Sequence, residues 1–169
     1  SYALRNKILL SGLELDLSLG EYNNKQLSTL SSSVSGNVTT LVTQQDRILF
    51  VGLNGNIVLS DFVLKFDTSH KKGKRFPGSN PLSGPWSEHE VSEFSFGADY
   101  SGFNDLSINV ELANTYIHKH NIQLANKQNE YGYSVRFDWR LYNDLLDLSL
   151  QHANILGDNG SFSSFSTVY

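Results

Sequence analysis

The sequence contains no cysteine and no methionine, and only three of its 169 residues are proline. Without cysteine, a disulfide framework, a thiolate metal site and a cysteine nucleophile are all excluded. Basic residues are not in excess either, because the formal net charge is -4, and this argues against a general nucleic-acid binder. The first residues lack an initiator methionine and the pattern of a signal peptide. We therefore expect a processed chain or a piece of a longer one.

Long apolar runs are also missing. No stretch approaches the roughly 18 apolar residues that a membrane helix needs, and apolar residues do not recur at a helical period. Instead, apolar and polar residues alternate along the chain. In Tyr131–Leu141 the aromatic and aliphatic residues alternate with glycine, serine and charged residues, and Leu146–Leu150 alternates again after the turn at 142–144. This pattern predicts a hairpin of two two-faced strands.

The same alternation recurs along the chain. Further strands are predicted at Lys7–Leu19, Arg47–Leu59, Phe62–Ser69, Glu93–Tyr100 and Leu106–Ala113, with a last stretch ending at Tyr169. Within Arg47–Leu59, the Asn-Gly-Asn at 54–56 resembles a hairpin turn, but the alternation continues through it, and we predict one strand. The polar segment Gly20–Gln45 is interpreted as a long loop or an extended hairpin, with a possible short strand at Val34–Val42.

Loops and turns alternate in length. His70–Glu88 is predicted to be a loop because it holds all the prolines, which cannot donate a ladder hydrogen bond. His118–Gln128 is a second polar loop, and Asn154–Gly160 leads into the last stretch. Short turns are predicted at Ser60-Asp61, Ser101–Asp105 and Tyr142-Asn143-Asp144, about 40 residues apart. Short turns at one end and longer loops at the other are typical of outer-membrane barrels.

The predicted fold class is therefore all-β, an antiparallel up-and-down meander of about seven or eight strands. Residues 1–169 are expected to form a single barrel segment, from a longer barrel in the bacterial outer membrane. In such a barrel the apolar residues face lipid and the charged residues line a polar lumen. The alternative is a soluble β-barrel whose apolar side chains line a cavity for a hydrophobic small molecule. Short residues beside the charges, and aromatics near strand ends, favour the membrane barrel.

The two sets of side chains can be assigned residue by residue. The candidate lumen-lining residues are Glu14, Asp16, Lys65, Asp67, Glu93, Asp99, Glu111, Arg136, Asp138, Arg140 and Asp147. The candidate lipid-facing residues are Leu49, Val51, Leu53, Phe94, Phe96, Val135, Phe137 and Trp139. Carboxylates outnumber bases in the first set, so the lumen is expected to favour cations or polar solutes. The alternative is that these charges pair across strands and only neutralise one another.

A family resemblance also favours an outer-membrane barrel. The segments Leu106–Ile117, Asn129–Phe137 and Tyr142–Leu150 resemble the C-terminal half of a large, poorly characterised family of proteobacterial outer-membrane proteins. The strand start at Asp46-Arg47 and the turn at Leu59–Phe62 are similar to that family too, although Ser60 stands where its members usually have glycine. The resemblance implies an outer-membrane barrel that is much longer than this chain. It also implies a gene neighbourhood with an RND-type exporter and a periplasmic lipoprotein-sorting-like protein as possible partners.

Other chemistry has weaker support in the sequence. His118 and His120 could ligate a metal, but two ligands without a third do not define a site. The basic residues of 71–75 could bind lipopolysaccharide phosphates or form an ordinary solvated loop. No Gly-x-Ser-x-Gly motif is present. We therefore predict no enzyme, no metal and no cofactor, and outer-membrane lipid as the main partner.

Overall fold

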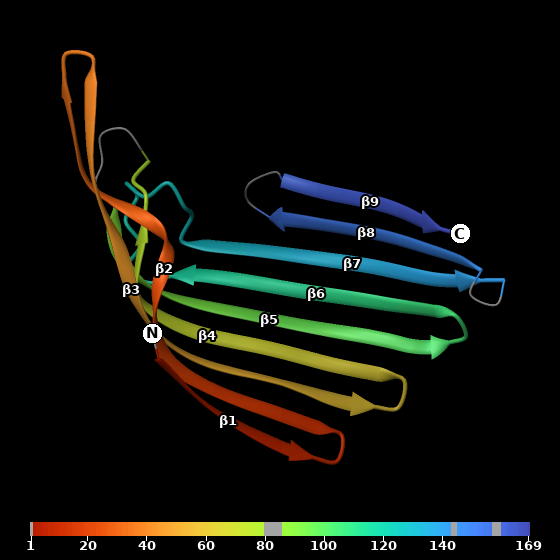
Figure 1. Ribbon diagram of the computed structural model, residues 1–169. Helices are drawn as coiled ribbons and strands as arrows, with labels where there is room; N and C mark the ends of the chain where they lie inside the picture. Colours follow the sequence, from red (N-terminus) through yellow and green to blue (C-terminus); the bar gives the residue numbers. More distant parts are fainter. Residues whose placement is uncertain (1, 80–85, 143–144, 157–159) are drawn as a thin grey trace.

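The computed structural model describes residues 2–79, 86–142, 145–156 and 160–169. In this part of the chain nine strands form one antiparallel sheet in sequence order (Figure 1). The strands are β1 (Tyr2–Leu10), β2 (Leu13–Ser35), β3 (Val38–Leu59), β4 (Phe62–Phe76), β5 (Ser87–Phe103), β6 (Leu106–Ile117), β7 (Asn129–Leu141), β8 (Leu146–Leu156) and β9 (Gly160–Val168). The predicted all-β meander is confirmed. The sheet is open, since β1 and β9 are its two edges.

Two-residue turns join the strands at one end of the sheet, on the right in Figure 1. They lie at Ser11-Gly12, Ser60-Asp61 and Asn104-Asp105, and each contains a residue with positive φ, namely 76° at Gly12, 54° at Ser60 and 63° at Asp105. Such left-handed residues let a hairpin close without splaying its strands. The prediction of a turn at Ser60-Asp61 is confirmed, whereas Asn143 and Asp144 of the last predicted turn lie outside the described residues.

The prediction of one strand over Lys7–Leu19 is wrong. The chain reverses at Ser11-Gly12, so that Leu10 pairs with Leu13 and Lys7 pairs with Asp16. Leucines continue on both sides of this turn, and alternation alone could not reveal the reversal. The additional hairpin brings the strands among the described residues to nine, instead of seven or eight.

Residues Gly20–Gln45 form the extended hairpin, and the alternative of a long loop is wrong. β2 and β3 continue to a tip at Gly36-Asn37, with register shifts after Asn23 and Thr29. The possible short strand at Val34–Val42 spans this tip. The tip of the hairpin rises away from the other strands at the upper left of Figure 1.

The predicted loop His70–Glu88 is also largely wrong, because β4 continues to Phe76 and β5 begins at Ser87. A bulge between Lys71 and Lys74 contains Gly73, whose φ is 87°. Only the segment between the two strands is left as a connection; it includes Pro77, while Pro81 and Pro85 lie outside the described residues. The segment 101–105 is likewise shorter as a turn than predicted, since β5 extends to Phe103. His118–Gln128 lies outside the strands, as predicted.

Gly73 should be sensitive to a side chain. We expect Gly73→Ala to lower the free energy of unfolding by about 2 kcal/mol, because the residue is left-handed and its Cβ would collide with the Arg47 carbonyl oxygen. The measurement is a urea titration of the full-length protein in lipid vesicles. Gly36→Ala is the matched control, since Gly36 also has positive φ but open space around it, and an equal loss in both variants would contradict the steric explanation.

Buried apolar residues are few and lie near the long-loop end of the sheet. Phe76, Val91, Ile117 and Leu124 form one buried cluster. Leu124 belongs to the loop 118–128, which bonds to the segment after β4: Ser79 N–H donates to the Gln123 carbonyl at 2.6 Å, and Ala125 N–H donates to Pro77 at 3.0 Å. This loop therefore covers one end of the sheet. Within the described ranges, no helix has the length and apolar character to cross a membrane.

Candidate functional site

The register places every predicted lumen-lining residue on one side of the sheet. Directly paired residues of neighbouring antiparallel strands lie on the same side, and the pairs run across the whole sheet. They include Lys65 with Gly97, Asp99 with Asn109 and Arg140 with Asp147. We call this side the charged face: Glu14, Asp16, Lys65, Asp67, Glu93, Asp99, Glu111, Arg136, Asp138, Arg140 and Asp147. The register thus shows that these charges share one side of the sheet, and their assignment to a lumen stays a prediction.

The predicted lipid-facing residues lie together on the opposite side, which we call the apolar face: Leu49, Val51, Leu53, Phe94, Phe96, Val135, Phe137 and Trp139. Their side chains are mostly exposed, with 39% of Phe137 and 49% of Trp139 accessible. Val135 is half-buried. Large apolar side chains that are exposed to this extent on one continuous face are unfavourable in water, so we expect an apolar medium or a partner to contact them.

Aromatic residues gather at both ends of the apolar face. At the short-turn end, the rings of Phe62 and Tyr100 lie 4.6 Å apart and those of Tyr100 and Phe103 lie 5.2 Å apart. Near the other end, Phe94 and Tyr131 are exposed, and each pairs with Asn114 of β6. Two aromatic girdles with aliphatic residues between them are a property of membrane barrels.

Beyond the second girdle the apolar face becomes polar. Arg47 forms an ion pair with Glu21, and Lys72 approaches Glu90 at 3.3 Å. Asn114 donates to Asn129 at 2.6 Å on the neighbouring strands. A row of polar pairs therefore ends the apolar stretch on the side of the long loops.

Most of the charges on the charged face are paired. Ion pairs join Arg5 to Asp16, Lys7 to Glu14, Lys65 to Asp99, Lys71 to Glu93 and Arg136 to Asp138. In one continuous strand over Lys7–Leu19, Lys7 would lie on the side opposite to Asp16, but the turn at Ser11-Gly12 brings it directly opposite Asp16 on the same side. The cross-strand pairing considered from the sequence is therefore real. In the described part of the chain Asp67 and Glu111 form no ion pair, so these two carboxylates leave unpaired negative charge on the charged face.

A buried polar network ties three strands together at the base of the long hairpin. Asp46 of β3, with 3% of its surface exposed, accepts a hydrogen bond from the Ser28 hydroxyl of β2. Its other oxygen lies 3.6 Å from Nε of Arg75 on β4. A buried carboxylate requires partners of this kind.

The basic residues of 71–75 are divided between the faces. Lys71 and Lys74 both approach Glu93, and Arg75 lies between Asp46 and Glu88. Lys72 alone pairs on the apolar side, with Glu90. The expected solvated loop is therefore a paired strand, and a phosphate site made by the four bases together is wrong, because alternation sends their side chains to opposite sides.

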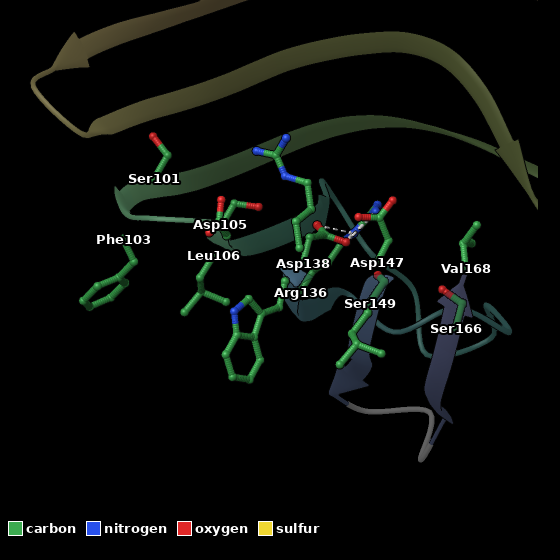
Figure 2. Close-up of a pocket in the computed structure, with 14 residues that line it drawn as sticks. Ser101, Phe103, Asp105, Leu106, Arg136, Asp138, Asp147, Ser149, Ser166 and Val168 are labelled. Atoms are coloured by element: carbon green, nitrogen blue, oxygen red, sulfur yellow. Dashed lines mark hydrogen bonds and ion pairs between the residues drawn. The ribbon is translucent and has the colours of Figure 1, made fainter. Parts of the chain in front are cut away.

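A hollow of about 380 Å³ lies at the short-turn end of β5–β9. Figure 2 shows Asp147 on the upper side of these strands, while Phe103 and Leu106 point to the lower side. Arg136, Arg140 and Asp138 contribute to its lining. The hollow is thus lined by apolar residues such as Trp139 together with charges of both signs.

No cluster of metal ligands exists among the described residues. His118 and His120, which share a side in the sequence pattern, separate in the structure. His118 Nε2 lies 2.8 Å from the Ser92 hydroxyl, whereas His120 Nε2 donates to the Asn126 carbonyl at 2.8 Å. The loop around 118–128 is not a strand, so the expected common side does not exist.

Solved structures share the fold. A structure of OmpT, an outer-membrane protein of Vibrio cholerae, aligns with a TM-score of 0.63 at 9% identity, over 90% of this chain and 44% of that one. Its loop L8 deletion mutant aligns with a TM-score of 0.64 at 10% identity, over 98% and 51%. The chain thus spans about half the length of these proteins and has the fold of an outer-membrane β-barrel segment. No protein-family model and no curated protein matches the sequence, so the family resemblance stays a prediction.

Several interacting residues were not predicted from the sequence. The partners Arg5, Ser28 and Asp46 depend on a turn and on bulges that shift the register. His70, Ser92 and His118 form a hydrogen-bonded group on the apolar side. Only the pairing of His70 with Ser92 across β4 and β5 brings this group together, and no local motif marks it.

Proposed function

We propose that this chain forms part of the wall of a channel-forming or export-associated β-barrel in the bacterial outer membrane. The observation that carries the proposal is the separation of faces. The register gathers the charges on one side, and large apolar side chains stay exposed on the other. Lipid supplies the cover that the apolar face lacks, and water in a lumen solvates the charged face.

The open sheet supports a larger barrel. In lipid, every unpaired N–H or C=O group of an edge strand costs several kcal/mol. Both β1 and β9 have a partner on one side only, and the solved barrels of similar fold are about twice as long as this chain. We infer that further strands close the barrel.

The proposed lumen favours cations. Paired charges cancel locally, whereas Asp67 and Glu111, which have no ion pair in the described segments, contribute net negative charge. Rings or rows of such charge set the selectivity of a pore. The exposed aromatic side chains of the apolar face favour this function over a soluble barrel, whose apolar residues would line a cavity.

Reversal potentials test the proposal. The full-length protein in a planar bilayer under a tenfold KCl gradient is expected to show a cation preference, and Asp67→Asn with Glu111→Gln should move the reversal potential towards zero, because the lumen loses its unpaired charges. Ser95→Ala, on the same face but uncharged, is the control. Anion preference of the unmodified protein, or no conductance, would refute the channel.

A further inference from the structure

A serine, two histidines and a glutamate meet at the long-loop end of the apolar face. His70 on β4 lies directly opposite Ser92 on β5, and Glu90 precedes Ser92 by two residues on the same side. His70 Nδ1 is 3.1 Å from Ser92 Oγ, and His70 Nε2 is 3.5 Å from a Glu90 carboxylate oxygen. His118, directly after β6, places its Nε2 2.8 Å from the same Oγ.

The hydrogen-bond donors in this group are set by its geometry. The Glu90 carboxylate lies 3.5 Å from His70 Nε2 and favours a proton on that nitrogen, which leaves Nδ1 free to accept a hydrogen bond from the Ser92 hydroxyl. Since the hydroxyl has one proton, His118 must donate from Nε2 to Oγ. A serine whose base is oriented by a carboxylate is the arrangement of an activated nucleophile.

The surroundings of the group are suited to a lipid. Two shallow hollows of about 180 and 200 Å³ reach His70 across the apolar face. The first also touches Ser92 and is bounded by Leu17 and Leu53, and the second is bounded by Leu19 and Leu49 and ends at Lys72. Aliphatic walls fit an acyl chain, and an ammonium group beside them fits an anionic headgroup.

We propose that Ser92 and His70 form a catalytic site for hydrolysis of acyl esters of membrane lipids, with Glu90 as a positioning residue. The site lies where the apolar face becomes polar, which is the level of lipid ester groups in the membrane orientation proposed above. The inference rests on that orientation but not on conductance. It differs from the expectation of no enzyme, because the sequence does not show that Ser92 and His70 are neighbours.

The reaction balances without any other reagent. Ser92 Oγ attacks the ester carbonyl carbon while its proton passes to His70 Nδ1, and His118 Nε2 donates to the developing oxyanion. The carbon–oxygen bond to the alcohol breaks, and the leaving oxygen takes the proton from His70. Water then attacks the acyl-serine, giving one proton to His70 and through it to Ser92, and a fatty acid is released.

Covalent labelling tests the nucleophile. The full-length protein in detergent micelles is treated with a fluorophosphonate probe, and the adduct is located by peptide mass spectrometry. We expect an adduct on Ser92, none in Ser92→Ala, and labelling at least about 100-fold slower in His70→Gln, which is the lower end of the usual range for loss of a general base. Ser95→Ala, on the same strand but the other face, should label normally. Glu90→Gln should change the pH profile of labelling, and Glu90→Asp should restore it.

Lipid hydrolysis tests the substrate class. Vesicles of phosphatidylglycerol with a fluorescent acyl chain should release fatty acid with the unmodified protein and not with Ser92→Ala. Heat-modifiable gel mobility shows that each variant is assembled. Absence of an adduct at Ser92, or equal labelling rates in His70→Gln, would overturn the site, and labelling without fatty-acid release would overturn the lipid substrate. A loss of hydrolysis in Ser92→Ala with unchanged conductance separates this inference from the channel.

Discussion

Phe137→Arg is expected to prevent stable insertion of the full-length protein into lipid vesicles. Phe137 is exposed on the apolar face, between Ile108 and Leu150 of the neighbouring strands. A guanidinium at this position must leave water for the hydrocarbon layer. On a barrel surface this costs up to about 2–4 kcal/mol, depending on the depth of the residue in the bilayer, in addition to the apolar contacts of the lost ring. The measurement is urea-dependent folding into vesicles, with heat-modifiable gel mobility as a second readout.

The adjacent position is the matched control. Asp138 lies on the charged face and pairs with Arg136, so Asp138→Arg should insert nearly as well as the unmodified protein. Its effect is expected in permeation, because it adds positive charge beside an unpaired Arg136. Phe137→Leu should also insert, since the side chain stays apolar. If Phe137→Arg assembles normally, or if Asp138→Arg blocks assembly equally, the two faces have been assigned wrongly.

Arg75→Met should be among the most destabilising changes in the chain. Arg75 is the cation beside Asp46, which is almost fully buried. Removing one partner of a buried pair leaves the other charge without compensation and costs about 3–5 kcal/mol. Because Asp46 keeps its bond from Ser28, we expect a loss of about 3 kcal/mol in the free energy of unfolding, measured by urea titration in vesicles.

A double variant separates the charge effect from lost packing. Arg75→Met combined with Asp46→Leu removes both charges. The double variant should therefore recover much of the stability that Arg75→Met alone loses. Lys72→Met is the exposed control, because neither member of the Lys72–Glu90 pair is buried, and it should change stability by less than about 1 kcal/mol. Equal losses in Lys72→Met and Arg75→Met would mean that burial of Asp46 has no special effect.

Local alternation explains why much of the fold could be predicted. Successive side chains of a strand point to opposite faces. The division between the two faces could therefore be predicted in segments such as Tyr131–Leu141 and Arg47–Leu59. Turns were harder to predict. The reversal at Ser11-Gly12 has leucines on both sides, and the bulge at Gly73 lets β4 continue through a basic segment that was predicted as loop.

The sequence by itself determined the class of the protein: alternating side chains, absence of helical periodicity, and turns spaced along the chain specify an antiparallel meander with one charged and one apolar side. Only the tertiary structure decided which charges pair and which residues meet. Partners such as Arg5 with Asp16, or His70 with Ser92, are distant along the chain. Their meeting depends on strand register, which is set by the exact length of each turn and bulge, and a shift of one residue would send every side chain to the other face.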